Sequence, residues 1–252
     1  MKIVISPAKS LDFETETPSD FFSDPIFIQK SERIQNTLKQ KSPKELSELM
    51  NISDKLADLN WQRNQDWSYP FTLENSRQAL YAFKGDVYQG LDAYSIATTK
   101  IPMLQDKVRI LSGLYGILKP FDLIQPYRLE MGTKLEVGSH KNLYDFWGNY
   151  ITEALNHELN DGDVLINLAS NEYFKAIKPK ELKVDIITPV FKDYKNGKLK
   201  VISFNAKKAR GMMVRYIIEN HVEQPCDIKN FNEGGYAYDE NLSSDKEFVF
   251  TK

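Results

Sequence analysis

The hydrophobic positions of the chain fall into runs of two different kinds. Residues 2–6, with the sequence KIVIS, form a continuous apolar run that Pro7 ends, which is typical of a buried strand. Between residues 26 and 59 the apolar positions instead recur at intervals of three and four, which predicts helices. Pro43 fits the first position of the second of these helices. The chain is therefore expected to begin with one strand followed by helices.

The middle of the chain predicts two further helices. An amphipathic pattern from residue 106 runs into Gly113 and Gly116 and stops at Pro120, so a helix is expected before the glycines. Residues 144–160 place an apolar residue at every fourth position, which predicts a second helix. The sequence NDGD at its end is typical of a turn.

Beyond this turn the hydrophobic pattern changes to that of strands. Residues 164–170 and 184–191 form apolar runs rich in β-branched residues, and residues 199–206 are similar. The Asn196–Gly197 dipeptide between the last two runs favours a two-residue hairpin turn. A last helix is expected over 211–221. Because strands and helices alternate without a linker or repeat, they are expected to share one core.

Composition limits the class of protein. With 252 residues, of which 41% are hydrophobic, the chain can form one large core, and we expect a single domain over 1–252. The expected fold is mixed α/β (α+β), with helices flanking a central mixed sheet. No apolar run reaches the length of a membrane span or a signal peptide, so no membrane partner is expected. The single cysteine, Cys226, excludes an internal disulfide and favours a cytoplasmic setting.

Charge and motifs exclude several functions. The chain has 33 basic and 35 acidic residues and a net charge of −2, so it is not a uniformly basic nucleic-acid binder, and any anion site must be a local patch. The glycine loops of nucleotide-binding proteins and the HExxH and GxSxG signatures are absent. The histidines, His140, His157 and His221, are scattered. We therefore expect no metal site and no cofactor.

Four polar clusters lie where predicted strands or helices end. Because the carboxyl ends of parallel strands meet at one edge of a sheet, and three of the clusters follow strands, we expect all four to converge in one cleft. The clusters are SPAKS with Ser6, Lys9 and Ser10; QPYRLEMG with Arg128 and Glu130; NLASNEYF with Asn167, Ser170 and Glu172; and AKKARG with Lys207, Lys208 and Arg210.

These clusters predict a site for an anion. The candidate anion-binding side chains are the five cations Lys9, Arg128, Lys207, Lys208 and Arg210, which together would attract phosphate or a nucleic-acid backbone.

The same clusters supply candidate catalytic residues, although no catalytic role is assigned. They are Ser10, Glu130, Ser170 and Glu172. The two carboxylates could act as general acid or base, or hold the cations in position. The serines could equally cap a turn.

The stretch ISFNAKKARGMMVRYIIE carries the sharpest signal for an anion. It reads as a strand that passes into a helix, with Lys207, Lys208 and Arg210 in the turn between them. The amino-terminal end of a helix dipole is positive, so cations placed there are repelled. The arrangement is therefore unfavourable unless an anion is bound. Gly211 would let that anion approach the backbone. The alternative is that the three cations form a solvated face.

Gly113 and Gly116 permit a second mode of phosphate binding. In a helix-hairpin-helix element a glycine turn lets backbone amides approach a DNA phosphate, and these two glycines are therefore candidate DNA-binding residues. A purely structural turn is the alternative.

Taken in order, several long motifs resemble the bacterial peroxide stress resistance protein YaaA family. The resemblance covers nearly the whole chain and rests on SPAKS, YAFKGDVYQGL, LSGLYGILKPFDLIQPYRLEMG, FWGNYI, INLASNEYFK, TPVFKDYKNGK and ISFNAKKARG.

The resemblance implies a cytoplasmic protein that protects against hydrogen peroxide by limiting free iron, and so Fenton damage to DNA. It also implies a single mixed α and β domain with a positively charged cleft, a helix-hairpin-helix element and non-specific DNA binding. For that element Gly85 and Gly90 are the alternative to Gly113 and Gly116. Two functions remain open: a DNA-binding protector, and an enzyme that acts on a phosphate-bearing or nucleic-acid substrate in the same cleft.

Overall fold

Five strands that are far apart in the sequence run parallel at the centre of one sheet. The computed structural model describes residues 1–252 throughout, and its main sheet has eight strands in the order β11-β12-β9-β8-β1-β5-β6, with β10 paired to β9. The parallel strands are β1 (Lys2–Ile5), β5 (Val108–Ser112), β8 (Val164–Leu168), β9 (Asp185–Lys195) and β12 (Glu247–Thr251). The antiparallel strands are β6 (Gly116–Leu118), β10 (Lys198–Lys200) and β11 (Ala237–Tyr238). The central mixed sheet expected from the sequence is confirmed.

The first strand lies in the middle of this sheet. Ile3 pairs with Val108 of β5 on one side and with Ile166 of β8 on the other, and all four residues of β1 are buried. The continuous apolar run KIVI has this composition because both faces of the strand are covered. Since the chain moves first to β5 and later to β8, the direction of its crossovers reverses at β1. In α/β sheets ligand sites collect at such a point, beyond the carboxyl ends of the strands.

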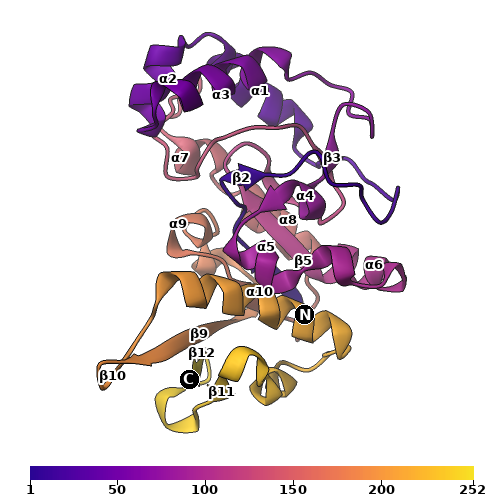
Figure 1. The fold of residues 1–252 in the computed structure, drawn as a ribbon, viewed down its shortest axis with the longest axis vertical. Coiled ribbons are helices and arrows are strands. Elements are labelled where there is room, and N and C mark those ends of the chain that lie inside the picture. Colours follow the sequence, from indigo (N-terminus) through magenta and orange to yellow (C-terminus); the bar gives the residue numbers. More distant parts are fainter.

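Helices cover the sheet on both faces and form a separate cap. Figure 1 shows α1 (Ile28–Lys39), α2 (Pro43–Met50) and α3 (Asp54–Asp66) together at the top, above the sheet. The remaining helices are α4 (Ala79–Ala82), α5 (Asp86–Leu91), α6 (Ile101–Lys107), α7 (Leu143–Trp147), α8 (Tyr150–Glu158), α9 (Asn171–Phe174) and α10 (Ser203–Glu219). Two small ladders, β2 (Ser10–Leu11) with β4 (Phe83–Lys84) and β3 (Arg77–Gln78) with β7 (Leu123–Ile124), join the loops.

Local sequence signals explain several boundaries, and these predictions are confirmed. Pro43 is the first residue of α2, where Ser42 and Glu45 form a capping box. Asn196 and Gly197, both with positive φ, make the turn between β9 and β10. The helix expected over 144–160 is present but broken into α7 and α8, because Gly148 between them has a φ of +47°.

The helix expected before Gly113 ends at Lys107, so the prediction is wrong for the residues that follow. Residues 108–112 are strand β5, which is entirely buried between β1 and β6. A short apolar run such as VRIL does not distinguish a buried strand from a buried helix, and pairing with β1 decides the outcome here. Gly113 and Gly116 consequently lie in the β5–β6 hairpin and not between helices.

The expected start of the last helix is also wrong. Helix α10 begins at Ser203, eight residues before Gly211, and the preceding strand β10 ends at Lys200. The Asn205 side chain donates a hydrogen bond of 2.8 Å to Asp193 Oδ1 on β9, which fixes the first turn of the helix to the sheet. This tertiary contact outweighs the β preference of Val201, Ile202 and Phe204.

Helices α5 and α10 cross at unusually short distance. A Cβ atom on Gly211 would lie 1.8 Å from the carbonyl oxygen of Val87, and one on Gly90 would lie 2.0 Å from that of Lys208. Only glycine fits at either position, so each backbone rests directly on the other. The crossing fixes the position of α5 and of the loop that precedes it.

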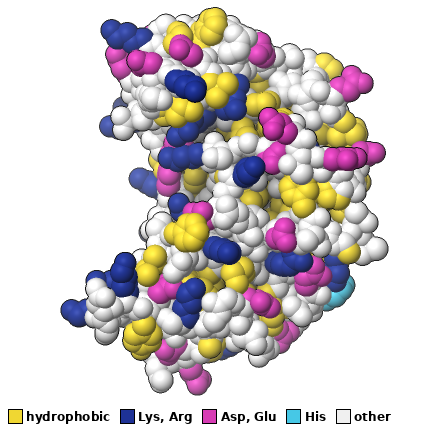
Figure 2. Space-filling model, viewed as in Figure 1, with side chains coloured by type: hydrophobic (Ala, Val, Ile, Leu, Met, Phe, Trp, Pro, Cys, Tyr) yellow, Lys and Arg dark blue, Asp and Glu magenta, His cyan; other side chains and the backbone are white.

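The molecular surface is hollowed on one side. In Figure 2 the hollow lies on the left, between the α1–α3 cap above and the end of the molecule that carries β9 and β10 below. Figure 1 places the left ends of α9 and α10 at this side. None of the helices combines the length and the apolar character that crossing a membrane requires.

Candidate anion-binding cavity

A cavity of about 430 Å³ lies beyond the carboxyl ends of β1 and β8. Five segments line it: residues 6–10 after β1, residues 84–88 around the start of α5, Glu130, residues of the β8–α9 junction, and Lys207 with Arg210 on α10. All four polar clusters of the sequence therefore contribute side chains to one site. The place is the one expected from the reversal of the crossovers at β1.

Hydrogen bonds between the two strand ends shape the floor of the cavity. The Ser170 N–H donates to Ser6 Oγ at 2.9 Å, and the two hydroxyl oxygens lie 3.3 Å apart. The Tyr88 hydroxyl donates to the carbonyl oxygen of Ser6 at 3.1 Å. Both serines thus take part in joining β1, β8 and α5, and neither contacts a histidine that could activate it as a nucleophile.

Three of the four cations that line the cavity have carboxylate partners. Lys9 Nζ lies 2.7 Å from Glu130 Oε2, and Lys84 Nζ lies 3.4 Å from Asp12. Lys207 Nζ is 4.0 Å from Asp86, at the limit of an ion pair. These pairs reduce the positive potential that the sequence alone implied.

Arg210 is the exception among these cations. Its side chain lines the cavity and is largely buried, but it forms no ion pair or hydrogen bond with the protein. Burial lowers the pKa of its guanidinium, since desolvation disfavours the charged form. Its nitrogen atoms are not sealed from solvent, so Arg210 is a candidate to bind an anion that enters the cavity.

The carboxylates of the site have different surroundings. Glu130 contacts two cations, Lys9 and Arg128, the latter at 3.6 Å, and so holds cations in position, one of the two roles expected for it. Glu172 accepts a hydrogen bond of 2.9 Å from the Gly132 N–H and contacts no cation.

Arg128 lies beside the main cavity. It lines a small adjoining pocket together with Lys9, Tyr127 and Tyr173. Its Nε atom is buried and has no hydrogen-bond acceptor. The pocket has a volume of about 10 Å³, which is too small for a phosphate, so anion binding by Arg128 stays a prediction.

Some predicted residues lie elsewhere. Lys208 is exposed on α10 and does not line the cavity, and its carbonyl oxygen packs against Gly90. Gly113 and Gly116 are buried: Gly113 packs on the backbone of Leu129 and Gly116 on the ring of Trp147, so a phosphate cannot reach their amides. Their placement in a helix-hairpin-helix turn is therefore wrong.

Two further corrections concern the individual clusters. The cations of AKKARG do not lie in the turn before a helix, because Lys207 and Arg210 are in the second and third turns of α10. The macrodipole acts mainly on the first turn, so its repulsion is weaker than the sequence implied. Asn167 points away from the cavity and donates to Thr188 of β9 at 3.3 Å.

Sequence reasoning missed one wall of the cavity. Lys84, Asp86 and Tyr88 line it from the segment FKGDVYQGL, which matched the family motif but contains no long cationic run. The signal available was Gly85, which precedes the short helix α5 and itself lines the cavity.

The arrangement defines a class of site: a polar cavity at the carboxyl edge of a largely parallel α/β sheet, with anion binding as its predicted role. The protein contains no group of three His, Cys, Asp or Glu side chains placed to hold a metal ion. Burial raises the pKa of Tyr173 far above its ordinary value, as do the neighbouring Tyr127 and the carboxylates Glu172 and Glu130, so its hydroxyl remains a hydrogen-bond donor.

The chain belongs to the peroxide stress protein YaaA family, whose model matches residues 1–242. It is similar over its full length to a UPF0246 protein of Flavobacterium johnsoniae, with 62% identity over 252 residues and complete coverage of both chains. A UPF0246 protein of Flavobacterium psychrophilum is 59% identical, also with complete coverage. One of Hahella chejuensis is 56% identical over all of this chain and 99% of its own. The resemblance seen in the sequence motifs is thereby confirmed.

Proposed function

We propose that this peroxide stress protein binds DNA phosphates at the cavity and along the adjoining hollow, and so protects DNA during oxidative stress. The observation that carries the proposal is Arg210, a largely buried cation that faces a cavity without any protein partner. A phosphodiester supplies the acceptor oxygens that a guanidinium needs, in a geometry suited to two hydrogen bonds.

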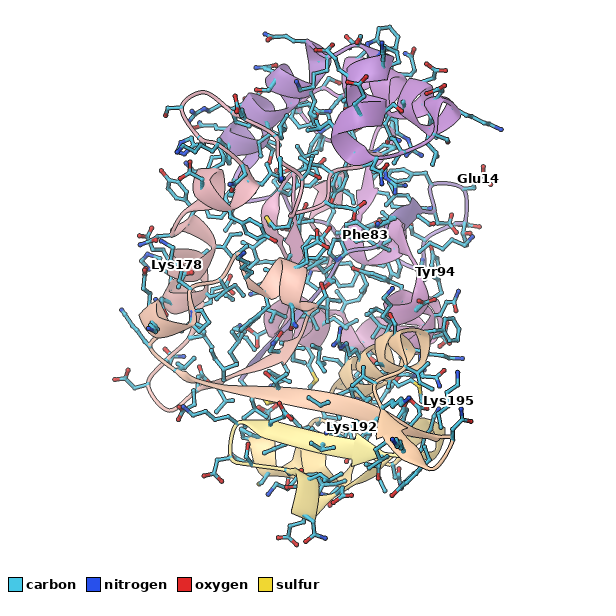
Figure 3. The ribbon with its side chains drawn as sticks, turned by 90° about the vertical axis from the view of Figure 1, so that its left-hand side faces the viewer. Glu14, Phe83, Tyr94, Lys178, Lys192 and Lys195 are labelled. Carbon is cyan, nitrogen blue, oxygen red and sulfur yellow. The ribbon has the colours of Figure 1, made fainter.

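The surface around the cavity supports this proposal. Figure 2 displays several Lys and Arg side chains along the rim of the hollow. In Figure 3, which looks onto this side, Lys192 and Lys195 lie toward the far end of β9, while Lys178 lies across from them. A duplex is too large for a cavity of about 430 Å³, so it would lie across the hollow and place one phosphate at Arg210.

The expected mode of binding is without sequence preference. Lysine and arginine side chains at the rim are suited to phosphate oxygens, which carry no sequence information. Of the two glycine pairs considered for a helix-hairpin-helix element, only Gly85 borders the cavity. It lies between the short helices α4 and α5, and we assign the hairpin-like element to this segment.

Limitation of free iron is the second part of the proposed function. Membership of a peroxide stress family supports it, because Fenton chemistry links peroxide and free iron to DNA damage. Its test is the concentration of chelatable iron in peroxide-treated cells that carry or lack the gene. Equal iron concentrations in the two strains would exclude this part while leaving DNA binding open.

The DNA-binding part is tested by removing the cations of α10. Replacing Lys207 and Arg210 together by glutamine is expected to weaken binding of a short duplex at least tenfold, measured by fluorescence anisotropy, because two phosphate contacts are lost. Lys246→Gln is the matched control: Lys246 is exposed at the amino end of β12, the opposite edge of the parallel strands. Equal loss in both proteins would contradict a role for the cavity.

One observation favours the second candidate function, an enzyme that acts on a phosphate-bearing substrate. The cavity has the size of a site for a small organic molecule, since such sites have volumes of about 300–1,000 Å³. Glu172, which contacts no cation, is the candidate general base there. Turnover of a phosphate ester that Glu172→Gln abolishes would establish this function.

A further inference from the structure

Two side chains of opposite charge in the cavity are unpaired. Arg210 has no protein partner, and Glu172 accepts one backbone hydrogen bond but forms no ion pair. The other charged side chains that line the cavity form the pairs Lys9–Glu130, Lys84–Asp12 and Lys207–Asp86. Arg210 and Glu172 do not pair with each other, although both face the same space.

A ligand that satisfies both side chains needs two different groups. A guanidinium only donates hydrogen bonds, so Arg210 is suited to an anion; a carboxylate accepts them, so Glu172 is suited to a donor. An inorganic anion satisfies the first requirement alone. The volume of about 430 Å³ also exceeds what a single anion fills. The ligand is therefore an organic molecule with an anionic group at one end and N–H groups at the other.

The walls of the cavity indicate what joins these two groups. Tyr88 and Tyr173 line it and are only 7% and 8% exposed, so each presents a small aromatic surface to a planar group. A free amino acid carries both charges but has no planar group for these surfaces and is small for the cavity. A nucleotide has a phosphate, a planar base and, in cytosine, adenine and guanine, an exocyclic amino group.

We propose that the cavity binds one nucleotide unit, with its phosphate at Arg210 and the amino-bearing edge of its base at Glu172. The inference rests on the proposed function in one respect, that a phosphate binds at Arg210. It adds that a single nucleotide enters the cavity, whether free or at an unpaired position of a strand. The paired nucleotides of an intact duplex remain outside.

The test compares two nucleotides whose bases present opposite hydrogen-bonding edges. Cytosine carries an amino donor at C4 and an acceptor at N3, whereas uracil carries a carbonyl acceptor at C4 and an N–H donor at N3, so CMP and UMP test whether Glu172 contacts the amino group. In calorimetric titrations of the full chain, CMP is expected to bind about tenfold more tightly than UMP, the usual effect of a hydrogen bond to a charged group. Cytidine and inorganic phosphate, which each lack one of the two groups, are expected to bind at least tenfold more weakly than CMP.

Variants of Arg210 and Glu172 test which end of the nucleotide each side chain contacts. Arg210→Gln is expected to weaken CMP and UMP alike, by tenfold or more. Glu172→Gln is expected to narrow the difference between CMP and UMP, because the amide can donate to the uracil carbonyl. Lys246→Gln, with the same change of charge as Arg210→Gln, leaves both affinities unchanged. Arg210→Lys retains the charge and is expected to lose less affinity than Arg210→Gln, which separates a lost contact from a misfolded protein.

The outcomes also separate this inference from the proposed function. Equal affinities for CMP and UMP, or phosphate binding as tight as that of CMP, would overturn it. Duplex binding without any CMP binding would overturn it as well and leave the DNA-protection proposal standing. CMP binding that depends on Arg210 and Glu172, in a protein that does not bind duplex DNA, would support the inference and contradict that proposal.

Discussion

A single buried carboxyl group links the loop before α1 to the body of the protein. Asp122, which is 1% exposed, accepts hydrogen bonds from the Ser23 hydroxyl at 2.6 Å and from the Lys119 N–H at 2.8 Å. The Gln105 side chain donates to the same serine hydroxyl at 2.7 Å. Burial raises the pKa of Asp122 to about 6, although the Ser23 hydroxyl and the Lys119 amide oppose the shift. The acid therefore changes charge close to neutral pH.

This pKa predicts a pH dependence of stability. Because the folded protein holds the proton more tightly than the unfolded chain, the stabilisation is full below about pH 4 and is lost as the pH rises through about 6. Asp122→Asn remains neutral throughout. Between pH 4 and pH 7.5 its unfolding free energy, measured with denaturant, is expected to gain about 2 kcal/mol relative to that of the wild type.

The comparison of the two proteins cancels every other group that titrates in this range. A constant difference in unfolding free energy across the range would contradict the raised pKa of Asp122.

At the scale of elements, the crossing of α5 and α10 determines one wall of the cavity. An alanine in place of a glycine inside a helix normally stabilises it by about 0.5–1 kcal/mol. Gly211→Ala is expected to do the opposite and lower the unfolding free energy by about 2 kcal/mol, since the new methyl group overlaps the carbonyl oxygen of Val87.

A neighbouring substitution provides the control for Gly211→Ala. Lys208→Ala changes an exposed position of the same helix and is expected to alter stability by less than about 0.5 kcal/mol. If Gly211→Ala proved as stable as the wild type, the close contact of the two helices would be wrong.

Which elements the sequence could predict depends on how local their causes are. The strand at residues 2–5, the capped helix at Pro43 and the Asn196–Gly197 turn follow from neighbouring residues, and all three are confirmed. The predictions for residues 108–112 and for the start of α10 were wrong because contacts with distant strands decide both. Strand β5 pairs with β1, and Asp193 of β9 binds the first turn of α10.

The candidate site divides in the same way. Side chains that follow a strand, such as Ser6 and Ser170, could be expected to meet because strand ends share one edge of the sheet. That Lys84, Asp86 and Tyr88 also line the cavity could not be predicted, because their position depends on the packing of α5 against α10. The ion pairs within the cavity could not be predicted from the sequence either. They leave Arg210 as the cavity cation without a carboxylate partner.

At the scale of the whole molecule, salt dependence measures how much surface DNA covers. Each phosphate neutralised contributes about −0.9 to the slope of log K against log salt concentration. A duplex that lies along the hollow is expected to give a slope of about −4 or steeper, measured by anisotropy between low and physiological salt. A slope near −1 would mean that only the phosphate at Arg210 is held, and an affinity independent of salt would contradict phosphate binding altogether.

The central position of β1 has a consequence for biosynthesis. The segment KIVI leaves the ribosome well before its partners β5 and β8, which begin only at residues 108 and 164. Until then an apolar strand with two open edges is exposed in the nascent chain, a state prone to aggregation. A chaperone that binds extended hydrophobic segments is expected to associate with ribosome-bound chains that end before residue 164 and to leave those in which β8 has emerged.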